Sequence, residues 1–138
     1  MKTINEKLYY LIKHDRKYEM EAYRFIFDSL NYTFKNMLKI EKRHVTGKEL
    51  LNGCRLYAID QFGCLAKTVL NEIGIHNTRD IGELVYNLIN HNLLGKQDSD
   101  KIEDFNNIFN FNRAFNLKPK FKYDLVKNKF LTKYIQKR

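Results

Sequence analysis

The chain has 138 residues, a length typical of one domain, and a formal net charge of +9. No apolar run approaches the roughly 20 residues of a membrane helix, and Asn5, Glu6 and Lys7 stand where a signal peptide would need apolar side chains. Cys54 and Cys64 match neither a disulfide framework nor a CxxC motif, so we expect a soluble cytoplasmic protein.

Helical periodicity dominates the first two thirds of the chain. Thr3 and Glu6 have capping-box spacing, and a long helix is predicted from about residue 18 to 38. A second capping box at Thr46 begins a helix that bends at Gly63 and ends at Gly74, with another helix from Asn77 or Thr78 to Gly95. The predicted core comprises Phe25, Leu30, Leu50, Tyr57, Val69, Leu84 and Leu88.

The aromatic segment 104–111 predicts either one short strand or an irregular stretch. If it forms a strand, residues 46–111 have the order of a winged helix-turn-helix with residues 78–92 as the recognition helix. The exposed face of that helix carries one acid and one base, which gives little attraction for a duplex. The predicted fold class is mostly α, a compact helical domain of about five helices with at most a minor β-hairpin.

The C-terminal segment carries most of the charge. Residues 116–138 contain eight basic residues against Asp124, a net charge of +7. Val126, Phe130 and Tyr134 recur at four-residue steps, which predicts a basic amphipathic helix after Pro119. The expected organisation is a helical domain over 1–117 and a basic extension over 118–138.

A neutral domain with a basic appendage indicates attraction to a polyanion. Lysines neutralise phosphates, and interleaved aromatic rings can stack on unpaired bases. The candidate nucleic-acid-binding residues in the extension are Lys118, Lys120, Phe121, Lys122, Lys127, Lys129, Lys133, Lys137 and Arg138. A second basic patch is Lys39, Lys42 and Arg43, with a solvated lysine-rich face as the alternative interpretation.

Signals for catalysis are missing from the sequence. His14, His44, His76 and His91 are dispersed, without the spacing of a zinc site. The chain has no glycine-rich phosphate loop and no Gly-x-Ser-x-Gly motif. We therefore expect a non-enzyme that needs no cofactor and no metal.

Four segments in order, EAYRFIFDSLNYT, RHVTGKELLNGCRLYAIDQFG, TVLNEIGIHNTRDIGELVYNLINHNLLGK and DFNNIFNFNRAF, resemble a small bacterial domain family of unknown function. The resemblance covers residues 18–115. It implies a compact, mostly helical domain and no particular activity. Such relatives usually lack so basic an extension, which marks residues 116–138 as an addition of this chain.

The leading hypothesis is a nucleic-acid-associated protein, with RNA favoured over DNA and a ribosome or larger ribonucleoprotein assembly as its setting. The alternatives are a protein–protein interaction module, a winged-helix DNA-binding protein, and a protein that attaches to anionic lipid through its basic segment.

Overall fold

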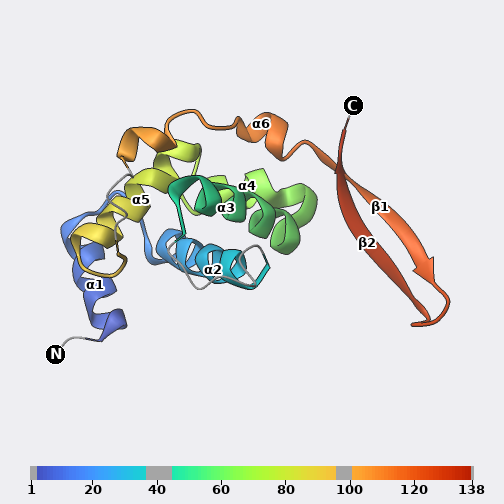
Figure 1. Cartoon of the computed structure of the whole chain (residues 1–138), viewed down its shortest axis with the longest axis horizontal. Coiled ribbons are helices and arrows are strands. Elements are labelled where there is room, and N and C mark those ends of the chain that lie inside the picture. Colours follow the sequence, from blue (N-terminus) through green and yellow to red (C-terminus); the bar gives the residue numbers. More distant parts are fainter. Residues whose placement is uncertain (1–2, 37–44, 96–100, 138) are drawn as a thin grey trace.

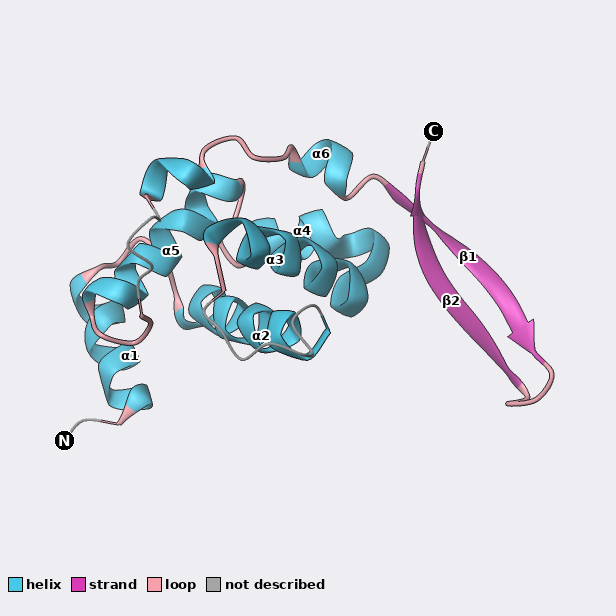
Figure 2. Ribbon diagram, in the orientation of Figure 1, coloured by secondary structure: helices cyan, strands magenta, loops and turns pink. Residues whose placement is uncertain are grey.

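Helices form most of the chain up to residue 114, and a two-stranded hairpin forms its C-terminal part (Figures 1 and 2). The structure, a computed structural model, describes residues 3–36, 45–95 and 101–137. The helices are α1 Ile4–His14, α2 Met20–Asn36, α3 Gly47–Phe62, α4 Ala66–Glu72, α5 Thr78–Asn90 and α6 Phe111–Ala114. Two 3₁₀ turns, η1 Gly63–Leu65 and η2 Ile102–Phe105, interrupt this order, and the strands are β1 Leu117–Asp124 and β2 Lys129–Gln136. The predicted fold class, mostly α with a minor hairpin, is confirmed.

Helix boundaries follow from local hydrogen bonds. The Thr3 and Thr46 side chains each accept from the backbone N–H three residues on, and Glu6 and Glu49 accept from the cap N–H groups in return. Both predicted capping boxes are therefore present. Asn77 caps α5, since its side chain accepts from the N–H of Asp80 at 2.9 Å.

Two boundaries differ from the prediction, and a third is not described. Gly63 ends α3 in a positive-φ conformation (φ 54°), and η1 separates it from α4. Helix α5 ends at Asn90 rather than Gly95, because Asn92 is left-handed and the N–H of Leu93 bonds to the carbonyl of Leu88 at 2.8 Å. Helix α2 ends at Asn36, and residues 37–38 of the predicted helix lie outside the described residues.

The core lies between α2, α3 and α5 and is closed by the aromatic segment after α5. Leu84 and Leu88 are fully buried, and Phe25 and Leu50 are nearly so. Leu30 and Tyr57 are half-buried and pack against the core. Val69, in the middle of α4, is half-buried but is not part of this core, so its prediction as a core residue is wrong. Phe105 packs flat against α5, where a Cβ on Gly82 would approach the Cβ of Phe105 to 2.6 Å.

Residues 104–111 form no strand. Phe105 ends η2, the chain then runs irregularly, and α6 begins at Phe111. The irregular alternative is therefore correct. No strand occurs in the described parts of 46–111, so the winged-helix interpretation, which needs a wing there, is wrong.

The prediction of an amphipathic helix over 118–138 is also wrong, because β1 and β2 occupy this segment. Apolar residues also alternate at two-residue steps here, which suits a strand. Asp124 then starts the turn, accepting from the N–H groups of Val126 and Lys127 at 2.9 and 3.0 Å. Asn128 completes the turn in a left-handed conformation (φ 54°).

The hairpin extends away from the helices and is held at its base (Figure 1). Leu117 is buried, and its carbonyl accepts from the Cys64 thiol at 3.4 Å. The Tyr134 ring lies directly against Gly63, in the space that a Cβ there would fill. Gln136 donates from Nε2 to the carbonyl of Ala114 at 3.1 Å. No helix in the described ranges is long and apolar enough to cross a membrane.

Candidate nucleic-acid interface

The register of the hairpin separates its side chains into two faces. Residues that lie directly opposite one another in an antiparallel pair share a face, and neighbours along a strand alternate. Lys118 pairs with Ile135, Lys120 with Lys133, Lys122 with Leu131, and Asp124 with Lys129. Leu117 pairs with Gln136, Pro119 with Tyr134, Phe121 with Thr132, and Tyr123 with Phe130. We name these two sets the lysine face and the aromatic face.

The lysine face carries five exposed ammonium groups, those of Lys118, Lys120, Lys122, Lys129 and Lys133. Alternate residues of a strand lie about 6.8 Å apart, so the charges form closely spaced rows. Lys120 and Lys133 lie directly opposite each other, an arrangement that destabilises a hairpin. None of the five is in an ion pair with any described acid. The face therefore carries five ammonium groups against one carboxylate, that of Asp124, which lies opposite Lys129.

The aromatic face is exposed toward the tip of the hairpin and covered at its base. Phe130 is 71% exposed and Phe121 is 63% exposed. The rings of Tyr123 and Phe130 meet edge to face, with centroids 5.1 Å apart. Tyr134 is the more covered ring because it lies against Gly63. Rings that stand in solvent in this way offer flat apolar surfaces to a ligand.

The structure brings together some of the predicted binding residues and separates others. Lys118, Lys120, Lys122, Lys129 and Lys133 share one face, while Phe121 lies on the opposite face. Two more lie beyond the strands: Lys127 in the turn, and Lys137 after β2, where its N–H donates to the carbonyl of Asn116 at 2.9 Å. Arg138, Lys39, Lys42 and Arg43 lie outside the described residues.

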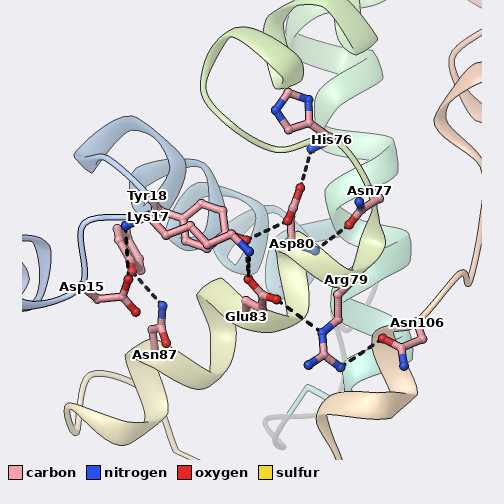
Figure 3. A network of polar contacts seen from close by, with 11 residues as sticks. Asp15, Lys17, Tyr18, His76, Asn77, Arg79, Asp80, Glu83, Asn87 and Asn106 are labelled. Atoms are coloured by element: carbon pink, nitrogen blue, oxygen red, sulfur yellow. Dashed lines mark hydrogen bonds and ion pairs between the residues drawn. The ribbon is translucent and has the colours of Figure 1, made fainter.

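Sequence reasoning missed a polar network between α5 and the loop before α2 (Figure 3). The Tyr18 hydroxyl lies 2.8 Å from Asp80 Oδ1 and 2.7 Å from Glu83 Oε1. Lys17 Nζ reaches the same Glu83 oxygen at 2.6 Å, and Arg79 Nε lies 3.5 Å from Glu83 Oε2. Asp80 and Glu83 are three residues apart on a helix, a spacing that places both carboxylates on one face and could have identified this cluster.

The Tyr18 hydroxyl stays protonated within this network at neutral pH. Burial, with the hydrogen bonds to Glu83 and Asp80, raises the pKa of Tyr18 well above its usual range, so the phenol stays a donor at neutral pH. Burial acts to raise the pKa of Glu83, but hydrogen bonds from Lys17 and Tyr18 outweigh it and lower that pKa. We therefore assign this cluster a structural role: it fastens the loop before α2 to α5.

The ring hydrogen bonds of the described histidines are all to nearby residues in the sequence. The Nδ1 atoms of His14 and His91 lie 2.9 Å from the carbonyls of Tyr10 and Asn87, one helical turn earlier. His76 Nδ1 lies 3.1 Å from Asn71 Oδ1, and His44 lies outside the described residues. No group of three metal-ligating side chains occurs within residues 3–36, 45–95 and 101–137.

Comparisons with known proteins give no match to a protein-family model, to a curated protein or to a solved structure.

Proposed function

We propose that this protein is a non-enzymatic nucleic-acid-binding protein that holds RNA through its C-terminal hairpin. One observation supports the proposal above all: the strand register gathers five exposed lysines and a single acid, Asp124, on one face, and none of the five is in an ion pair with a described acid. Such a face destabilises the free hairpin by repulsion and gains stability when a polyanion covers it. Each lysine that neutralises a phosphate releases a condensed counterion, which makes binding favourable and salt-dependent.

The preference for RNA with unpaired bases is supported by the aromatic face. Phe121, Tyr123 and Phe130 are exposed, and an aromatic ring can stack on a base only where the base is unpaired. A duplex would present phosphates to the lysines but no base faces to the rings. Unpaired RNA uses both faces of the hairpin.

A single strand can reach both faces from the outer edge of β1. The hairpin has only two strands, so this edge has no neighbouring strand. Along it, Lys120 and Lys122 alternate with Phe121 and Tyr123. A nucleic-acid strand that follows the edge thus meets a cation and a ring in turn, with phosphates toward the lysine face and bases toward the aromatic face.

The test is a triple substitution, K118Q/K120Q/K122Q, with binding of a single-stranded RNA measured over a range of salt concentrations. The slope of log K against log salt should flatten by about 2, since each phosphate contact to a single strand contributes about 0.7. The matched control is R16Q/R24Q/K35Q, which removes the same charge from exposed positions on the helical part. The control should keep the steep slope. An equal loss of affinity in the two variants would show that only net charge matters. Unchanged RNA binding in K118Q/K120Q/K122Q would favour the alternative of a protein–protein interaction module.

A further inference from the structure

Two cavities adjoin on the surface of the helical part, on either side of Phe109. The smaller, of about 350 Å³, lies between the α4–α5 connection and residues 107–112. The larger, of about 540 Å³, lies between α3, α6 and the end of β2. Asn107, Phe109 and Asn110 line both cavities, so the two adjoin along this segment, and we name them together the groove.

The groove is positively charged throughout. Arg55 and Arg113 line the larger cavity and Lys67 lines the smaller one. No acidic side chain of the described residues lines either cavity, and none pairs with these three cations. The guanidinium of Arg55 has one neutral partner, Asn52 Oδ1 at 2.8 Å. A groove with three cations and no acid favours an anionic ligand.

Asparagines supply most of the remaining polar groups in the groove. Asn110 uses its Oδ1 to accept from the N–H groups of Asn112 and Arg113 at 2.7 and 3.4 Å, so its amide NH₂ is left to donate. Within the described part of the chain, the side chains of Asn107 and Asn112 have no hydrogen-bond partner. Amides that both donate and accept suit the edges of unpaired bases, and Phe109 adds a half-buried ring.

The groove begins where the hairpin ends. Gln136, the last residue of β2, lines the larger cavity and bonds to the carbonyl of Ala114 in α6. Arg113 lies beside Ala114 on the same wall. A strand leaving the base of the hairpin therefore meets Arg113 and Arg55 first and reaches the asparagines and Lys67 beyond Phe109.

We infer that this groove is a second binding site for the same strand, in which arginines hold phosphates and asparagines contact unpaired bases. The inference rests on the proposed function, because it takes the hairpin as the first contact. It adds a prediction about the length of the RNA: a short RNA contacts the hairpin only, while a longer one also occupies the groove.

The experiment compares an oligouridylate of about 5 nucleotides with one of about 15, within the range of site sizes known for single-strand binding. The full-length protein should bind the longer one at least about tenfold more tightly, as expected from one added stacked base. In R55Q/R113Q the affinities for the longer and the shorter RNA should differ by no more than about threefold. The slope of log K against log salt for the longer RNA should flatten by about 1.4, since two phosphate contacts are lost. The control R24Q/K35Q should keep both the gain in affinity and the steep slope. If R55Q/R113Q still binds the longer RNA about tenfold more tightly, the proposal of a second site in the groove is wrong. Loss of binding in K118Q/K120Q/K122Q would still support RNA binding by the hairpin.

The reverse result also separates the two proposals. If R55Q/R113Q loses the gain while the triple lysine variant binds as before, the groove binds RNA independently of the hairpin, and both the hairpin proposal and the inference of a second site for the same strand fall. Cross-linking of a photoreactive uridine in the longer RNA gives a measurement on the unaltered chain. Cross-links within residues 107–113 support the groove, and cross-links confined to residues 117–136 overturn it.

Discussion

At the scale of single residues, Tyr18 has one proton and two carboxylate partners. Its hydroxyl lies 2.8 Å from Asp80 and 2.7 Å from Glu83, so the proton is shared or donated to one of them. Lys17 completes the charge balance on the Glu83 oxygen. Loss of the phenol would leave two carboxylate oxygens without this donor, one of them on a buried side chain.

Tyr18→Phe should therefore reduce the free energy of unfolding at neutral pH by about 1.5–3 kcal/mol, the range for a hydrogen bond to a charged group. Because the folded pKa of Glu83 is lowered, its stabilising effect is complete above the unfolded value of about 4.3 and disappears as pH falls through the folded pKa. The difference between wild type and variant should thus shrink in acid. Urea unfolding at pH 7 and at about pH 3 checks both statements, and a difference that grows in acid would contradict them.

Gly63 is the other residue with a strict requirement. Its φ of 54° is one that residues with a Cβ rarely adopt, and the Tyr134 ring occupies the space of that Cβ. Gly63→Ala should destabilise the fold by about 1–3 kcal/mol through backbone strain. It should also loosen the hairpin base, which near-ultraviolet circular dichroism of the tyrosines would report. Adding Tyr134→Ala should relieve the steric part, so a double variant with fully additive losses would argue against this contact.

At the scale of elements, the sequence was most informative where local chemistry decides the structure. The Thr3 and Thr46 capping boxes and the helix end at Gly74, which has a positive φ of 92°, were all predicted, since each depends on residues a few positions apart. The stripe containing Leu84 and Leu88 identified the buried face of α5 in the same way.

The C-terminal segment shows where such reasoning fails. Val126, Phe130 and Tyr134 have helical spacing, yet Val126 lies in a turn and is 96% exposed. Residues 118–123 alternate at two-residue steps, and pairing with residues 130–135 decides in favour of strands. Short apolar patterns fit both periods, and only the partner strand distinguishes them. The groove could not be predicted from the sequence for a related reason. Arg55, Arg113 and Gln136 are far apart in the sequence and line the same cavity only in the folded protein.

The hairpin and the helical part meet at the base of the hairpin. Leu117 is the last buried residue of the described chain, and only the hairpin base contacts the helices. Deleting residues 118–138 should leave the helical part folded, with loss of most RNA binding. Far-ultraviolet circular dichroism and an RNA titration of the truncated chain measure the two effects. A truncated chain that binds as tightly as the intact one at every salt concentration would remove the hairpin from the function.

At the scale of the whole molecule, charge is distributed along one direction. The hairpin segment carries +7 of the net +9, and the first 115 residues carry only +2. This asymmetry orients the molecule as a polyanion approaches, so the hairpin meets it first. The attraction decreases beyond about 10 Å at 0.1 M salt, so the rate of association with a polyanion should fall as salt is raised.

The lysines that alternate with aromatic residues along β1 and β2 also affect self-association of the hairpin. Both edges of a two-stranded sheet offer unpaired backbone groups, and another copy of the chain could add a strand there. Closely spaced ammonium groups repel a second hairpin from either edge, as lysines do on exposed edge strands in many proteins. On the proposed function, the lysines that would hold a phosphate backbone also oppose edge-to-edge pairing of a hairpin whose Phe121 and Phe130 are exposed. Replacing these lysines by neutral residues should therefore favour self-association of the hairpin as well as weaken RNA binding.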